Sequence, residues 1–230
     1  MMPDVEFLIL KTLKIDAFSK TDLAWYNEQF VIVRSLNCQG WFKNWIGRRL
    51  ANREAQVIAH LAKQTKTSKT GVDYPNFPIL LYKDSNYLIR SYIPGCPLNR
   101  AGKISADYFK KAKNLVKLLH RNHIVHNDLE KAENWIVMDN GQPGIIDFQI
   151  AKYFKQPNKL MHLLMAEDIR HVLKNKARFC SENLKKKEQI RLKQRPKISR
   201  WFRGTFKPIY NFITRKLFRY SDRKSSKYSH

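Results

Sequence analysis

Two short stretches of this chain combine carboxylate, amide and imidazole side chains at spacings that suit phosphate chemistry. His126 precedes Asp128 by two positions, and Asn134 follows Asp128 by six. A second acidic residue, Asp147, is followed directly by Phe148. Carboxylate and amide oxygens bind Mg²⁺, and a further carboxylate can accept the proton of a hydroxyl. The pattern therefore indicates a metal–nucleotide site with a base directed at a hydroxyl, as phosphoryl transfer requires.

A predicted hairpin places the two acidic residues near each other. Strands are expected at Trp135–Met138 and Gly144–Ile146, joined by a turn at residues 139–142 that contains an Asn-Gly pair. Asp128 lies before this hairpin and Asp147 directly after it. We therefore expect both carboxylates to face the same cleft.

The N-terminal part reads as strands followed by a helix. Residues 7–34 predict strands, with Phe30–Val33 preceded across an Asn-Glu turn by Asp22–Tyr26. Residues 47–62 then change to helical period, with an apolar stripe. Glu54 lies on this stripe, where an inward carboxylate needs a cation. Arg34, at the end of the preceding strand, is the candidate partner; the alternative is that Glu54 lies at the edge of the stripe and meets solvent.

The middle of the chain predicts a hairpin, a connector and a helix. Strands are expected at residues 78–82 and 87–91. Tyr92–Pro97 contains two prolines and a glycine, which predicts an ordered connector that could act as a hinge. Ser105 is a good N-cap for a following helix, and the chain again reads helical from about Ala166.

Composition suggests an anionic partner and a reducing compartment. The 230 residues include 44 Lys or Arg and 19 Asp or Glu, a net charge of +25. Such an excess favours phosphate-rich ligands, nucleic acid or an acidic membrane surface as partners. Cys38, Cys96 and Cys180 form no CxxC pair, and the apolar run Phe7–Leu10 is too short for a signal-peptide core. We expect a cytoplasmic protein with peripheral contact at the inner membrane.

Taken together, the motifs resemble the catalytic loop and metal-binding motif of the protein-kinase-like superfamily. They are most similar to RIO-type kinases and related small bacterial kinases, including those that act on lipopolysaccharide-core sugars. The resemblance covers roughly residues 20–175 in order. It implies an α+β, two-lobed fold with an antiparallel β N-lobe at about residues 1–91 and a reduced, mostly helical C-lobe at about residues 95–184.

Roles follow from this resemblance residue by residue. Asp128 would accept the proton of the acceptor hydroxyl, with Lys131 beside it and His126 supporting the loop. Asn134 and Asp147 would hold Mg²⁺ against the phosphates of ATP. The implied nucleotide-binding residues are Arg34, in place of the usual lysine, its partner Glu54, and the hinge residues Ser91, Tyr92 and Ile93.

Several positions depart from the family pattern. The chain has one extra residue, seen as Glu130, between the catalytic aspartate and the metal-binding Asn134, which leaves Glu133 as an alternative ligand. Asn127 replaces the arginine that many kinases pair with a phosphorylated loop, and Gln149 replaces a glycine. There is also no glycine-rich loop between residues 10 and 30 and no Ala-Pro-Glu motif after residue 149.

Two functions in different classes remain open. The first is an Mg²⁺–ATP-dependent kinase of an atypical Ser/Thr type, with a lipopolysaccharide-core sugar as the alternative acceptor. The second is a pseudokinase that serves as a binding module. A zinc site at His120, His123 and His126 is disfavoured, because no cysteine or further histidine completes a four-ligand set.

The C-terminal segment 185–230 carries sixteen Lys or Arg residues against Glu188 and Asp222. A helical stripe is predicted within it at Phe202, Phe206, Tyr210, Ile213 and Leu217. Packing of this basic amphipathic extension on the C-lobe, contact with an anionic membrane and, as the weakest option, binding to nucleic acid are the three interpretations.

Overall fold

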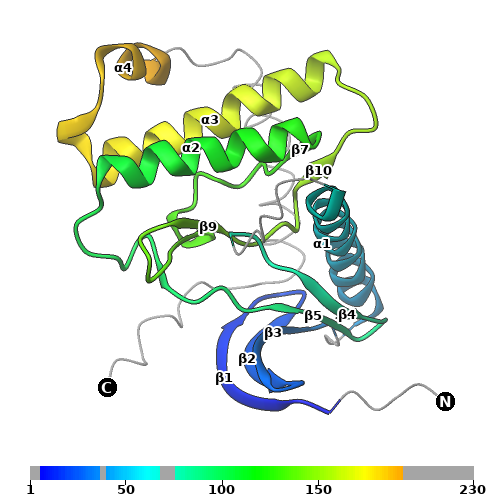
Figure 1. The fold of residues 1–230 in the computed structure, drawn as a ribbon. Coiled ribbons are helices and arrows are strands. Elements are labelled where there is room, and N and C mark those ends of the chain that lie inside the picture. Colours follow the sequence, from blue (N-terminus) through cyan, green and yellow to red (C-terminus); the bar gives the residue numbers. More distant parts are fainter. Residues whose placement is uncertain (1–5, 37–39, 68–75, 194–230) are drawn as a thin grey trace.

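The computed structural model describes residues 6–36, 40–67 and 76–193. This part of the chain has an α+β architecture with a five-stranded antiparallel sheet, two smaller antiparallel sheets of three and two strands, and several helices (Figure 1). The predicted stripe at residues 202–217 and Cys38 lie outside the described residues.

A five-stranded antiparallel sheet forms the N-terminal part. Its order is β1-β2-β3-β5-β4, so the strand after β3 along the sheet is β5 rather than β4. The Asn-Glu turn between β2 and β3 has positive φ at both residues, 47° and 61°. The strands are β1 (Leu8–Ile15), β2 (Lys20–Tyr26), β3 (Gln29–Ser35), β4 (Leu80–Lys83) and β5 (Tyr87–Ser91). The predicted strands in this region are therefore confirmed.

Helix α1 (Trp41–Thr67) joins β3 to β4 and is longer than the predicted 47–62. The prediction missed its first turns because Trp41 and Trp45 are exposed and do not continue the buried stripe. The stripe itself packs as expected, with Val57 and Ile58 almost fully buried. Figure 1 shows α1 between the sheet and the two long helices that follow.

A connector leads from the sheet to the helical part. Gly95 has a φ of 138°, and an added Cβ would collide with the carbonyl of Val137. The connector is thus packed closely on strand β8 (Trp135–Val137), with which β6 (Cys96–Pro97) pairs. The prediction that Tyr92–Pro97 forms an ordered connector is confirmed.

Helices α2 (Ala106–Arg121) and α3 (Lys159–Phe179) lie side by side (Figure 1). Ser105 caps α2 as predicted, with its hydroxyl accepting a hydrogen bond from the Tyr108 N–H. The predicted start of the later helix near Ala166 was wrong, since Asn158 caps α3 through the Met161 N–H. Short elements complete this part: β7 (Ile124–Val125), η1 (Ala132–Asn134), β9 (Pro143–Ile145), β10 (Lys152–Tyr153), η2 (Ser181–Asn183) and α4 (Lys186–Lys193).

The largest hydrophobic core joins α1, α2, α3 and the β8–β9 hairpin, and it includes Trp135 and Phe148. The sheet has separate, smaller clusters, one of which contains Val31, Val33 and Ile89. The segments that carry the candidate site, around residues 126–134 and 146–148, are therefore anchored in the main core. Over the described ranges, none of the helices has the length and apolar character to cross a membrane.

Candidate active site

The loop between β7 and β8 gathers three of the predicted site residues. Lys131 Nζ lies 2.7 Å from Asp128 Oδ2, and Asn134 Nδ2 donates to the same oxygen at 2.9 Å. A second hydrogen bond, also of 2.9 Å, runs from Asn134 Nδ2 to the Asp128 carbonyl. The side chain of Asp128 is mostly buried but reaches solvent. Asp128, Lys131 and Asn134 thus form one hydrogen-bonded cluster.

The β8–β9 hairpin connects this cluster to the second acidic residue. Trp135 pairs with Ile145, and beyond that pair Ile146 N donates to the Asn134 carbonyl at 3.0 Å. Asp147 is therefore the residue directly after a hydrogen-bonded partner of Asn134. Because both protons of an amide group lie on its nitrogen, the two bonds to Asp128 leave the Asn134 side-chain oxygen available as a ligand.

Asp147 is held in an uncommon backbone conformation with a carboxylate oxygen that lacks a hydrogen-bond donor. Its φ is 67°, in the left-handed region that clusters at functional sites. Oδ1 is buried without a hydrogen-bond partner and lies 3.9 Å from Arg34 Nη2. Burial works to raise the pKa of Asp147, but the charges of Arg34 and Arg90 outweigh it and hold the pKa below its usual value. The carboxylate is thus ionised at neutral pH, as metal binding requires.

The inward orientation of Glu54 is confirmed, together with its predicted partner. Glu54 is 0% exposed, and Arg34 Nη1 lies 2.5 Å from its Oε2. The second oxygen, Oε1, forms an ion pair with Arg90 of β5, which the sequence reasoning missed. Burial lowers the pKa of Arg90, and the Glu54 charge opposes this. Glu54 therefore bridges two buried arginines from neighbouring strands, one of which faces Asp147.

His126 supports the loop, as predicted, through three fixed contacts. Its Nδ1 accepts from the Asp128 N–H at 3.3 Å, and its Nε2 donates to the Ile146 carbonyl at 3.1 Å. The ring also packs on Phe148, with centroids 4.8 Å apart. Burial lowers the pKa of His126 against the opposing charges of nearby carboxylates. A neutral imidazole suits this arrangement, since one nitrogen accepts and the other donates.

A further functional residue, Asp168 on α3, was missed. It is buried and accepts hydrogen bonds from the backbone N–H groups of His126, at 2.8 Å, and Asn127, at 3.0 Å. His120 Nε2 lies 3.2 Å from the same carboxylate. The sequence contained a signal for this residue. Asp168 is next to Ile169 on the apolar face of α3, and Glu54 lies on a similar apolar face of α1. This carboxylate fixes the loop that carries Asp128.

The predicted hinge residues lie apart from the loop, at the end of β5. Ser91 pairs with Val31, three residues before Arg34 on β3. The N–H groups of Ser91 and Tyr92 already donate to the carbonyls of Ile79 and Phe30. The backbone N–H groups of Ser91 and Tyr92 are therefore occupied within the sheet, and Ile93 is buried.

The geometry distinguishes Glu133 from Asn134 as a ligand and bears on the histidines at positions 120, 123 and 126. Glu133 is exposed, whereas Asn134 is buried and bonded to Asp128, so the geometry favours Asn134 as the ligand. His120 and His126 have different partners, Asp168 and Ile146. No group of three or more His, Cys, Asp or Glu residues suited to a metal ion occurs within residues 6–36, 40–67 and 76–193.

Comparison with known proteins adds no assignment: no family model matches this chain, and a search of curated proteins finds no match.

Proposed function

We propose that this chain is an Mg²⁺–ATP-dependent phosphotransferase that acts on a hydroxyl group. One observation carries the proposal: a continuous set of contacts runs from Asp128 through Asn134 and Ile146 to Asp147, Arg34 and Glu54. It joins a base candidate, two oxygen ligands and a buried cation. Phosphoryl transfer needs these parts because it depends on positioning and on charge stabilisation.

The residues present fit a magnesium ion. Asn134 offers an amide oxygen, and Asp147 offers a buried carboxylate oxygen without a hydrogen-bond donor. Magnesium is commonly held by one or two carboxylates together with substrate phosphates and water. A site with few protein ligands is therefore consistent with a metal that arrives with its nucleotide.

Each residue of the cluster has a defined part in the proposed reaction. Bound Mg²⁺–ATP would supply the phosphoryl group, and the metal ion would neutralise part of the phosphate charge. Asp128 accepts the proton of the acceptor hydroxyl, while the Lys131 ammonium at 2.7 Å balances negative charge beside it. Arg34, held by Glu54, presents a fixed positive charge toward Asp147 and the phosphates.

We also propose that the α+β architecture is a two-lobed, kinase-like fold. The separate cores of the sheet and of the helical part, joined by the connector after Ser91, support two lobes. Residues 1–184 would form the kinase-like domain, with residues 185–230 as the basic extension.

The acceptor is proposed to be a protein Ser or Thr, with a sugar hydroxyl at the membrane face as the second candidate. One observation favours the second. Trp41 and Trp45 at the start of α1 are 81% and 51% exposed, and Arg49 stacks over the Trp45 ring at 5.4 Å. Exposed tryptophans beside arginines are typical of surfaces that contact anionic membranes. Cytoplasmic location with peripheral membrane contact is part of this proposal.

The test is transfer of label from γ-labelled ATP to separate envelope, ribosome and soluble-protein fractions. We expect Mg²⁺-dependent labelling that disappears with Asp147→Asn, because the metal-binding oxygen loses its charge. Label on a Ser or Thr residue would identify the first acceptor class, and label in the lipid-linked sugar material the second. Equal labelling by wild type and Asp147→Asn would contradict the proposed function.

A further inference from the structure

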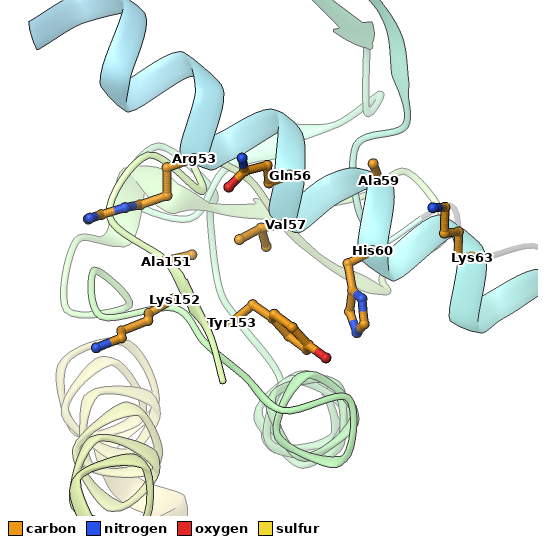
Figure 2. Close-up of a pocket in the computed structure, with 9 residues that line it drawn as sticks. All are labelled: Arg53, Gln56, Val57, Ala59, His60, Lys63, Ala151, Lys152 and Tyr153. Carbon is orange, nitrogen blue, oxygen red and sulfur yellow. The ribbon is translucent and has the colours of Figure 1, made fainter. Parts of the chain in front are cut away.

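A groove outside the candidate active site separates α1 from the segment that follows Asp147. It encloses about 500 Å³, a volume typical of small-molecule sites. One wall comes from α1 and includes Arg53, Gln56 and His60, and the other comes from β10, with Lys152 and Tyr153 (Figure 2).

The charge of the groove has one sign. Arg53, Lys63 and Lys152 line it, and its lining includes no Asp or Glu. Arg53 and Lys152 are both exposed, and within the described ranges no ion pair involves either side chain. The Lys152 ammonium instead lies over the Phe154 ring at 4.7 Å. Arg53 and Lys152, which share one concave site with no carboxylate in its lining, favour an anionic ligand.

The two ends of the groove differ in chemistry. Figure 2 shows Arg53 and Lys152 extending toward the same side at one end. At the other end His60 and Tyr153 lie side by side, with ring centroids 4.1 Å apart. Tyr153 is 40% exposed, so part of its ring is available for stacking. A guanidinium and an ammonium bind phosphate oxygens strongly, and an exposed ring binds another flat ring.

We propose that this groove binds an aromatic organic phosphate of mononucleotide size. The phosphate lies between Arg53 and Lys152, and the base stacks against Tyr153. This site shares no lining residue with the proposed Mg²⁺–ATP site.

Ligand binding here also connects to the proposed function. Arg53 precedes Glu54 on α1, and Lys152 lies five residues after Asp147. A ligand held by both walls therefore fixes α1 against the segment that carries Asp147. This regulatory consequence rests on the proposed phosphotransfer, whereas binding itself does not.

His60 provides a readout within the groove. Burial lowers its pKa, and the charges of His123 and Lys63 lower it further, while a backbone hydrogen bond to Asn122 opposes them. The negative charge of a phosphate bound at the other end of the same groove favours the protonated ring. The pKa of His60, measured by NMR titration of its ring proton, should therefore rise when the ligand binds.

The test measures binding of adenosine monophosphate to the full chain without Mg²⁺, by calorimetry and by the His60 titration. Arg53→Gln combined with Lys152→Gln should weaken binding by about tenfold or more, since two charge-assisted contacts are lost. The matched control is Arg100→Gln with Lys103→Gln, which removes the same charge from exposed positions that do not line the groove and should leave the affinity unchanged.

Each other outcome has a defined meaning. Equal weakening in both double variants, or an unchanged His60 titration, would overturn the proposal. If adenosine bound as tightly as adenosine monophosphate, the phosphate would contribute nothing to binding. If inorganic phosphate bound as tightly, the ring would contribute nothing. Either result would contradict the assigned ligand. Asp147→Asn should bind adenosine monophosphate normally even if it transfers no phosphate, which separates this proposal from the proposed function. Loss of binding in that variant would place the ligand in the other site and overturn the inference.

Discussion

Replacing Glu54 with leucine should lower the free energy of unfolding by about 3–5 kcal/mol, because it removes the buried carboxylate that both buried arginines bind. Arg34 and Arg90 are both almost fully buried and each forms an ion pair with one Glu54 oxygen. Breaking one partner of such a group is costly, since the remaining charges stay away from water. Urea unfolding monitored by circular dichroism would measure the change.

A control separates this effect from the loss of any carboxylate. Glu133→Leu removes an exposed carboxylate near the same site and should change stability by no more than about 0.5 kcal/mol. Combining Glu54→Leu with Arg90→Met should recover part of the loss, because it removes one of the unpaired charges. If Glu54→Leu unfolds at the same urea concentration as Glu133→Leu, the two-arginine bridge is not a stabilising feature.

Replacing Asp128 with asparagine should reduce the rate of phosphate transfer by about 10²- to 10⁴-fold while leaving ATP binding nearly unchanged. Asparagine can still accept hydrogen bonds from Lys131 and Asn134, so the loop should keep its arrangement. It cannot accept the acceptor's proton. Single-turnover transfer to the labelled fraction, together with calorimetric ATP binding, would separate the two effects.

The matched control here is Asp139→Asn, an exposed aspartate in the β8–β9 turn, which should keep full activity. A transfer rate for Asp128→Asn equal to that of this control would remove Asp128 as the base. A loss of ATP binding equal to the loss of transfer would instead assign Asp128 to nucleotide binding.

How far the sequence could predict the site depended on local patterns. The pair of Glu54 and Arg34 was predictable because a carboxylate on an apolar stripe must find a cation, and the preceding strand offered one. Asp168 follows the same rule but was missed, since the buried face of α3 also carries Arg170, His171 and Lys176, which obscure its apolar stripe. Arg90 could not be found in this way, because its pairing depends on β5 lying beside β3.

Features formed by distant segments were not predictable from local patterns. The first turns of α1 were missed because their aromatic residues are exposed and show no buried stripe. The groove could not be predicted at all, because Arg53 and Lys152 come together only when α1 packs beside β10. Periodicity describes one element at a time, whereas these features depend on tertiary packing.

The most direct test of the account is calorimetric binding of ATP with and without Mg²⁺ to the wild type, Asp147→Asn and Asp139→Asn. We expect Mg²⁺ to strengthen ATP binding to the wild type and to Asp139→Asn. In Asp147→Asn the Mg²⁺-dependent affinity should fall by about tenfold or more, because a charged metal ligand is lost. Identical affinities with and without Mg²⁺, or an unchanged Mg²⁺ dependence in Asp147→Asn, would contradict the proposed metal–nucleotide site.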